Sequence, residues 1–269
     1  MVESLKELNR ICQKPRYKET GNWMVRNFER EAALPLTWLL LHTSITANQV
    51  TLISLWVGLL GILLFSFASH GAFLAGTFLL QFWYLLDHVD GQIARYRKTA
   101  CLTGRFFDFL THHLIHGVIF FSLGVYCFKK TGHFIFIPWG FLTSIAMTTF
   151  NLIHDTKYKT FFEALSKMKR IRIKEESPSP PSCGAKSDPN VLKEGFSFLH
   201  KVCEIHVLMN ILTVAAIFEA MLKGPLDLRF LLSVIYGIVV PLICVVKAIY
   251  VIRYRVVDES FRNTFEEIP

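Results

Sequence analysis

The sequence predicts an all-α integral membrane protein with six transmembrane helices and a short N-terminal interfacial helix. Hydrophobic residues make up 52% of the 269 residues and charged residues only 19%, whereas soluble chains carry about a quarter charged residues. The mean hydropathy is +0.38. Six stretches also approach the length of about 20 apolar residues that a helix needs to cross a bilayer. Soluble, fibrous and disordered classes are therefore excluded.

The N-terminal residues 1–45 are expected to form a cytoplasmic segment, because they are polar and contain no early apolar core of a signal peptide. Within this segment, Trp23 to Leu41 mixes apolar residues with charged ones such as Glu29 and Arg30. Such a mixture is typical of a helix that lies in the membrane interface. This stretch is therefore the predicted interfacial helix.

The membrane domain is expected over residues 46–255, and a cytoplasmic tail over residues 256–269. The predicted spans are Val50–Ser69, Gly71–Leu86, Phe106–Phe128, His133–Ile153, Val202–Leu222 and Leu228–Ile252. Residues 175–190, between the fourth and fifth spans, are rich in Pro and Ser and predict a flexible linker.

The distribution of Lys and Arg predicts the orientation of the spans. These residues fall mainly before the first span, in the connections after the second and fourth spans, and near the C-terminus. The opposite turns contain Lys129, Lys130, Lys223 and Arg229. The positive-inside rule therefore places both termini in the cytoplasm. This topology, together with the attraction of basic residues to anionic membrane lipids, accounts for the net charge of +8. No nucleic acid partner is therefore expected.

A carboxylate inside a membrane-spanning helix costs free energy, so its presence indicates a function. Several carboxylates lie where the second and third predicted spans meet the cytoplasmic leaflet. One helix face carries, at i, i+3, i+4, i+7 and i+8, the residues Asp87, Asp90, Gly91, Ala94 and Arg95. The face of the next helix carries, at i, i+4 and i+8, the residues Gly104, Asp108 and His112. Two antiparallel neighbours can turn these faces toward each other, which brings three carboxylates and one imidazole together.

The expected ligand of this cluster is a divalent metal. Three carboxylates in a low dielectric repel one another, and cations offset that repulsion. Mg²⁺ prefers oxygen ligands, and Mn²⁺ also tolerates an imidazole. One or two ions of Mg or Mn are therefore expected at Asp87, Asp90, Asp108 and His112. The alternative is that Asp–Arg pairs at these helix ends only anchor the spans.

This run resembles the signature of the CDP-alcohol phosphotransferase (CDP-alcohol phosphatidyltransferase) family, which reads D-x-x-D-G-x-x-A-R, eight residues, G-x-x-x-D-x-x-x-D. Seven fixed positions match, from Asp87 to Asp108, and the eight-residue gap from Tyr96 to Thr103 is intact. Six spans with the motif across the second and third also fit the family. The sequence departs from the signature at the last position, where His112 replaces the expected Asp.

The resemblance implies an enzyme of phospholipid or related phosphodiester synthesis. It would transfer a substituted phosphate group from a CDP-activated donor to an alcohol acceptor, release CMP, and act as a homodimer at the cytoplasmic leaflet. Asp108 and His112 are the implied catalytic residues, and a neutral imidazole suits a general base near neutral pH. A simple interhelical hydrogen bond is the alternative role for His112. The implied nucleotide-binding residues are Asp87, Gly91, Ala94, Arg95 and Gly104.

The acceptor side is less defined. Asp155, Lys201 and Glu204 are the candidates for acceptor binding, and an ordinary interfacial position is their alternative role. Two other functions remain open. The departure at His112 favours a catalytically impaired relative that binds a nucleotide or a lipid. A metal channel or transporter is disfavoured, because its polar groups would be expected near the midplane rather than at one leaflet.

Overall fold

The computed structural model describes residues 2–13, 25–168, 171–173, 201–222 and 226–267. Within these residues, six helices are long and apolar enough to cross a membrane. They are α3 (Ala47–Phe65), α4 (His70–Tyr96), α5 (Leu102–Thr131), α6 (Phe136–Leu165), α8 (Ile205–Leu222) and α9 (Leu228–Arg253). The prediction of an all-α integral membrane protein with six spanning helices is thereby confirmed.

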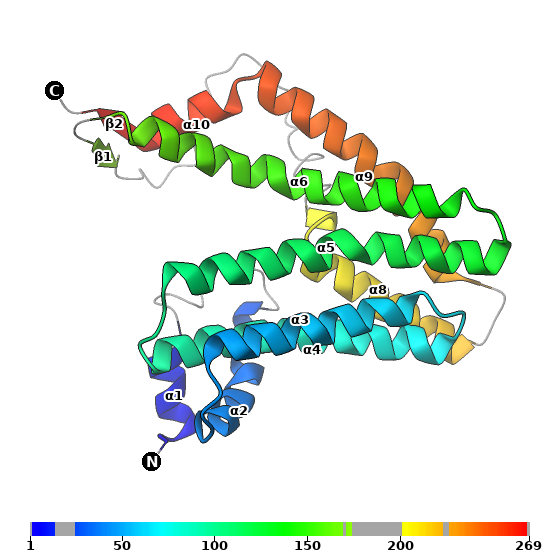
Figure 1. Cartoon of the computed structure of the whole chain (residues 1–269), viewed down its shortest axis with the longest axis horizontal. Coiled ribbons are helices and arrows are strands. Elements are labelled where there is room, and N and C mark those ends of the chain that lie inside the picture. Colours follow the sequence, from blue (N-terminus) through cyan, green and yellow to red (C-terminus); the bar gives the residue numbers. More distant parts are fainter. Residues whose placement is uncertain (1, 14–24, 169–170, 174–200, 223–225, 268–269) are drawn as a thin grey trace.

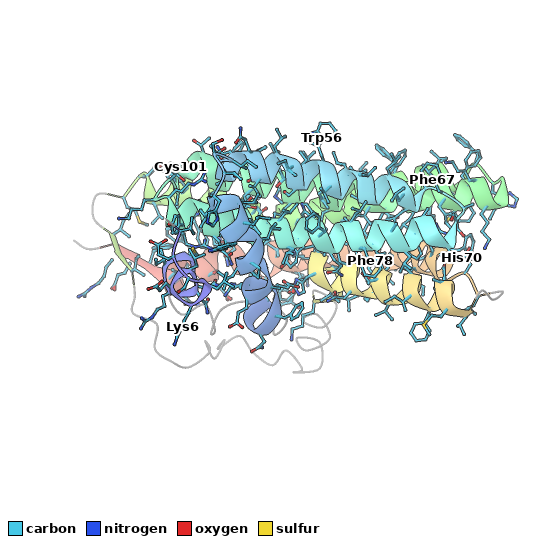
Figure 2. The ribbon with its side chains drawn as sticks, turned by 90° about the horizontal axis from the view of Figure 1, so that it is seen from below. Lys6, Trp56, Phe67, His70, Phe78 and Cys101 are labelled. Carbon is cyan, nitrogen blue, oxygen red and sulfur yellow. The ribbon has the colours of Figure 1, made fainter. Side chains whose placement is uncertain are left out.

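The six helices form an elongated bundle (Figure 1). α3 packs against α4 and α5, α5 packs against α6, α6 against α9, and α4 against α8. Large apolar side chains project outward along the bundle, among them Trp56 and Phe78, whose exposed fractions are 64% and 55% (Figure 2). Lipid tails are as apolar as these side chains, so a bilayer solvates this exterior without a penalty.

Glycines let α3 and α4 approach closely. A Cβ atom at Gly61 of α3 would lie 2.8 Å from the carbonyl oxygen of Gly76 on α4, and a Cβ atom at Gly76 would lie 2.6 Å from the carbonyl oxygen of Gly61. Small residues at such crossings allow membrane helices to reach backbone contact. The close packing holds α4, which carries most of the acidic motif, against α3.

Two helices precede the first spanning helix. α2 (Arg30–Leu41) follows a π-helical turn, η1 (Val25–Glu29). Together they cover the predicted interfacial helix except for residues 23 and 24, which lie outside the described part of the chain. The sequence did not predict α1 (Leu5–Cys12), which begins with a capping box closed by Ser4. A capping box satisfies two backbone N–H groups that a helix start otherwise leaves without partners.

Three spanning helices, α4, α5 and α6, extend by four residues or more beyond one end of the predicted spans. α4 continues past Leu86 to Tyr96, and α6 continues past Ile153. In α4 the extension is stabilised because Val89 and Ile93 are fully buried against α1 and α2. The predicted span ended at Leu86 because the continuous apolar run ends there. A helix can continue beyond such a run when one stripe of its surface is buried.

The C-terminal tail is structured in its described part. It contains α10 (Val256–Thr264) and the short strand β2 (Phe265–Glu267). β2 pairs antiparallel with β1 (Ile171–Ile173), beside the end of α6 (Figure 1). The linker predicted over residues 175–190 lies outside the described residues.

A buried polar network joins helices at the end of the bundle opposite α1 and α2. Arg229 was expected in an outer turn, but it lies in α9 and is 1% exposed. Its guanidinium donates to the carbonyl oxygens of Phe65 and Phe67, at 3.3 and 2.7 Å, and lies 3.6 Å from the ring centre of Tyr126. Glu219 of α8 accepts the backbone N–H of Arg229 at 2.7 Å. The network ties the ends of α3, α5, α8 and α9 together.

Candidate active site

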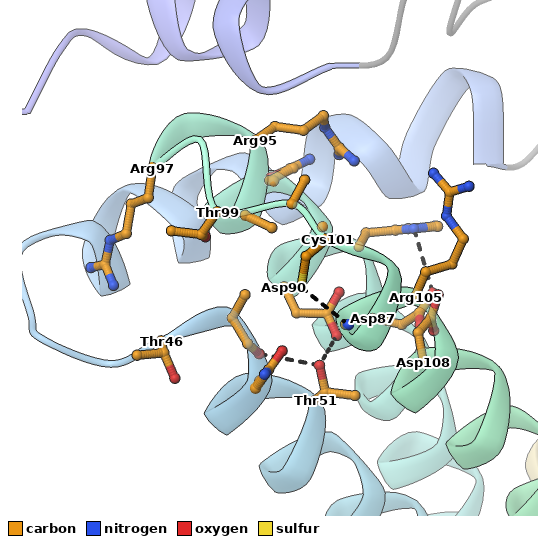
Figure 3. Close-up of a pocket in the computed structure, with 18 of the residues that line it drawn as sticks. Thr46, Thr51, Asp87, Asp90, Arg95, Arg97, Thr99, Cys101, Arg105 and Asp108 are labelled. Atoms are coloured by element: carbon orange, nitrogen blue, oxygen red, sulfur yellow. Dashed lines mark hydrogen bonds and ion pairs between the residues drawn. The ribbon is translucent and has the colours of Figure 1, made fainter.

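A cavity of about 580 Å³ lies where α4 ends and α5 begins (Figure 3). It collects residues from both helix faces that the sequence singled out. The cavity is lined by Asp87, Asp90, Gly91, Ala94, Arg95, Gly104 and Asp108, together with Gln13, which follows α1, and residues of α2 and α3. All seven residues that match the signature therefore face one space.

The short connection between α4 and α5 shapes this cavity. Lys98 takes a left-handed backbone conformation, with φ of 54°, and this ends α4. The guanidinium of Arg97 donates to the carbonyl oxygen of Ile45 at 2.5 Å, which ties the end of α4 to the chain before α3. Cys101 begins α5, because its sulfur accepts the backbone N–H of Gly104 at 3.4 Å. The acidic faces of α4 and α5 are thus held close to each other.

Asp87, Asp108 and His112 form the tightest polar group of the site. The Nε2 atom of His112 lies 2.8 Å from Oδ1 of Asp87 and 3.3 Å from Oδ1 of Asp108. Each residue offers a ligand atom, and these atoms all lie within 4.8 Å of one another. The juxtaposition predicted from the spacing on two helices is present for these three residues.

The group fits a divalent cation. Oδ1 of Asp108 is buried and makes no hydrogen bond within the described part of the chain, although Nε2 of His112 lies 3.3 Å from it. Buried polar atoms normally have a partner, and a bound cation would supply one. Two carboxylates and one imidazole match the ligand preference of an oxygen-seeking ion that also accepts nitrogen, such as Mn²⁺.

Asp90 makes a different contact. Its Oδ2 atom accepts the hydroxyl of Thr51 at 2.5 Å, and both side chains are buried where α3 crosses α4 (Figure 3). Asp90 lines the cavity but is not part of the group formed by Asp87, Asp108 and His112. The contact with Thr51 fixes the Asp90 carboxylate, and its predicted role as a metal ligand remains a prediction.

His112 lies on the inner side of the carboxylates. It is not among the residues that line the cavity. Its ring packs against Trp83, with the ring centres 5.1 Å apart, and Trp83 is 1% exposed. The cavity therefore extends from Asp87 toward the α4–α5 connection, whereas His112 faces the interior of the bundle.

Gly91 and Arg95 occupy one stretch of the cavity wall. A Cβ atom at Gly91 would lie 3.1 Å from Nη1 of Arg95, so the missing side chain makes room for the guanidinium. The Nε–H of Arg95 donates to the carbonyl oxygen of Cys12, the last residue of α1. At Gly104 a Cβ atom would meet Oδ1 of Asn48 at 3.5 Å, an ordinary contact.

Sequence reasoning missed the part of the wall that comes from the N-terminal segment. Gln13 and Arg30 both line the cavity. Two signals were available in the sequence. Ser4 and Glu7 have the spacing of a capping box, and Leu8 lies four residues before Cys12, as on one apolar face of a helix.

The structure does not bring the predicted acceptor residues to the cavity. Asp155, Lys201 and Glu204 are absent from its lining. Oδ2 of Asp155 lies 2.9 Å from Nε2 of His113, and Oε2 of Glu204 lies 3.0 Å from Nε2 of His206. Acceptor binding by these residues remains a prediction.

Comparison with known proteins supports the resemblance noted in the sequence. Residues 44–172 match the model of the family described as CDP-alcohol phosphatidyltransferase. The match covers α3 to α6 and so contains all seven signature positions, whereas Gln13 and Arg30 lie outside it. A search of curated proteins found no match.

Proposed function

We propose that this chain, whose residues 44–172 match the model of the CDP-alcohol phosphatidyltransferase family, transfers a substituted phosphate group from a CDP-activated donor to an alcohol acceptor with release of CMP. One observation carries the proposal. All seven signature residues line a single cavity that is bounded by an acidic group able to hold a cation. The product would be a phosphodiester of a lipid or a related compound.

The nucleotide and its diphosphate would occupy the cavity. Arg95 and Arg105 lie in its wall, and guanidinium groups bind phosphate oxygens through two parallel hydrogen bonds. Gly91 has no side chain and Ala94 has only a methyl group, so the donor can approach the backbone of α4 at these positions. The cavity volume of about 580 Å³ is within the range of small-molecule sites, about 300–1,000 Å³.

Asp87, Asp90 and Asp108 are the proposed holders of one or two Mg²⁺ or Mn²⁺ ions. A bound divalent cation neutralises the charge that develops on the phosphate and on the leaving CMP. Asp87 and Asp108 come from α4 and α5, so cation binding would also draw the two helix ends together. The Thr51 hydroxyl orients Asp90 from a third helix.

His112 is the proposed general base. When Nε2 donates its proton to Asp87, the lone pair of the neutral ring is on Nδ1. That nitrogen would take the hydroxyl proton of the acceptor while the acceptor oxygen bonds to phosphorus and the bond to CMP breaks. His112 does not line the cavity, and an in-line displacement needs the acceptor oxygen and CMP on opposite faces of the phosphorus. If His112 is instead a metal ligand through Nε2, this role is lost, and the two roles are separable by experiment.

The acceptor would approach His112 from the interior side of the bundle. Asp155, Lys201 and Glu204 are proposed to contribute to this side. Both described ends of the chain lie at the end of the bundle that carries the cavity (Figure 1). Together with the positive-inside bias, this arrangement supports cytoplasmic termini and an active site at the cytoplasmic leaflet. A homodimer is also proposed from the family resemblance.

The test is CMP release by the purified protein in detergent. Pools of CDP-linked donors and alcohol acceptors are supplied with Mn²⁺ or Mg²⁺, and CMP is quantified by chromatography. We expect CMP only when a donor, an acceptor and a divalent cation are all present. No CMP from any pool, together with measurable CDP binding, would support the second candidate, a catalytically impaired nucleotide-binding protein, which the His112 substitution favours.

A further inference from the structure

The N-terminal helix α1 is attached to the last turn of α4 at both of its ends. Before its start, Glu3 accepts the hydroxyl of Tyr96, the last residue of α4. At its other end the carbonyl oxygen of Cys12 accepts the Nε–H of Arg95. The two contacts fix α1 across the end of α4, directly beside the signature residues.

Apolar packing holds α1 in this position. Leu8 and Cys12 are fully buried, and they belong to one cluster with Ala33 and Leu34 of α2 and Ile93 of α4. Burial of a leucine side chain contributes roughly 1.5–3 kcal/mol, so the docked position of α1 is favoured by more than its two polar contacts.

The same segment also fixes the start of α2. Gln13, which follows α1, donates from Nε2 to the carbonyl oxygen of Arg30 at 3.2 Å. Gln92 of α4 donates to the same oxygen at 2.8 Å, and Thr37 donates to Oε1 of Gln92 at 2.6 Å. The backbone of Arg30 is therefore held by amides from two sides, while Arg30 lines the cavity.

Two chemically different sets of residues line the cavity. Gln13, Arg30 and Arg95 bring amide and guanidinium groups to the lining, whereas Asp87 and Asp108 bring carboxylates. In the view of Figure 3, Arg95 lies above Asp90 and Thr51. A nucleoside diphosphate bound with one phosphate near the acidic group would bring its other phosphate toward a basic wall.

We propose that α1 and Arg30 complete the nucleotide site, with α1 orienting the Arg95 guanidinium and Arg30 binding a phosphate of the nucleotide. This inference rests on the proposed function, because it takes a cytidine nucleotide as the ligand. It goes beyond the family match, since both α1 and Arg30 precede residue 44, where the match begins. α1 is a positioning element, and Arg30 is a binding residue.

The first experiment measures CDP affinity by calorimetry on the full-length protein in detergent with Mn²⁺. Arg30→Gln should weaken CDP binding about tenfold, as expected for loss of one charge-assisted hydrogen bond to phosphate. Arg10→Gln is the matched control, because Arg10 carries the same charge but is exposed on α1 and absent from the cavity lining. Its CDP affinity should equal that of the wild type.

The second experiment tests the positioning role of α1. Leu8→Ala should loosen α1 and weaken CDP binding, whereas Leu5→Ala, at a position 47% exposed on the same helix, should not. Hydrogen exchange adds a readout that needs no variant. Bound CDP should slow amide exchange in Leu5–Cys12 and leave exchange in α10 unchanged.

The outcomes separate the inference from the proposed function. Wild-type protein that binds no CDP in the presence of Mn²⁺ would overturn both. Wild-type protein that binds CDP with unchanged exchange in α1, and with equal affinity in the Arg30→Gln and Leu8→Ala variants, would overturn the inference alone. CDP-dependent protection of α1 together with weaker binding in both variants is the expected result.

Discussion

His112 Nε2 and Asp87 Oδ1 lie 2.8 Å apart, so an imidazole on α5 and a carboxylate on α4 share one hydrogen bond at the centre of the site. The signature that the sequence resembles predicts a carboxylate where His112 stands. A neutral imidazole at this position removes one negative charge from the cluster and adds a group that can accept a proton. This single pair therefore affects both how strongly a cation is held and how the acceptor is deprotonated.

The acidic group should be required for metal binding and for turnover. Asp108→Asn removes one ligand charge while preserving the shape of the side chain, so CMP release should fall by at least about a hundredfold. Mn²⁺ affinity, measured by electron paramagnetic resonance, should fall in parallel. Asp258→Asn is the matched control, because the Asp258 carboxylate pairs with Arg255 on the exposed side of α10. Equal Mn²⁺ affinity in Asp108→Asn and wild type would refute the assignment.

A base at position 112 should be visible in the pH profile. His112→Ala should lower the rate of CMP release by about 10²- to 10⁴-fold, with a much smaller change in Mn²⁺ affinity. The wild-type rate should decline as pH falls and the ring takes up a proton, and this decline should vanish in the variant. His42→Ala, at the exposed end of α2, is the control. A large loss of Mn²⁺ affinity in His112→Ala would show that the ring is a metal ligand instead.

Gly91 should control the position of Arg95. In Gly91→Ala the new methyl group would lie 3.1 Å from Nη1 of Arg95, so the flexible guanidinium must move while the helix remains intact. We expect CDP affinity to fall several-fold with no change in thermal stability. Gly71→Ala, where the nearest atom is the Ser69 hydroxyl at 3.8 Å, should bind CDP as the wild type does. Identical CDP affinities in both variants would mean that the Arg95 guanidinium does not contact the nucleotide.

Thiol labelling should report on occupancy of the cavity. Cys101 is exposed and lines the cavity, whereas burial raises the pKa of the Cys12 thiol and keeps it protonated. In a Cys183→Ser background, maleimide should modify Cys101 quickly and Cys12 slowly, as measured by peptide mass spectrometry. CDP with Mn²⁺ should slow modification of Cys101. Unchanged labelling at saturating CDP would indicate that the nucleotide binds elsewhere.

The Arg229 network should stabilise the fold without affecting the site. Glu219→Gln leaves a buried guanidinium without its counter-charge, which destabilises proteins by about 3–5 kcal/mol. The melting temperature in detergent should fall, while CDP affinity below that temperature should not change. The double variant Glu219→Gln with Arg229→Met should recover part of the loss, because it removes both charges. Melting temperatures equal to the wild type in the single variant would contradict the assigned role.

The sequence was sufficient for the spanning helices and for the motif, because both depend on local pattern. Apolar runs mark the spans, and helical spacing puts Asp87 with Asp90 and Asp108 with His112 on their respective faces. The ends of the helices were less predictable. α4 continues past Leu86 because Val89 and Ile93 are buried by α1 and α2, and that contact is tertiary.

The finer geometry of the site depends on contacts between distant segments. The pairing of Asp90 with Thr51 follows from the register of α3 against α4. The attachment of Arg95 to Cys12 requires the N-terminal segment to return to the end of α4. Arg229 was assigned to an outer turn by counting charges, but Glu219 of α8 and the carbonyl groups after α3 bury it. Periodicity within one helix carries no information on these partners.

Metal-dependent CMP release shows whether the acidic group between α4 and α5 holds a divalent cation used in phosphotransfer. Purified protein is incubated with CDP-linked donors and alcohol acceptors, first with Mn²⁺ and then with excess EDTA. We expect CMP formation that stops with EDTA, returns when Mn²⁺ is restored, and is absent in Asp108→Asn. CMP formation that continues unchanged in EDTA, or in Asp108→Asn, would contradict this expectation.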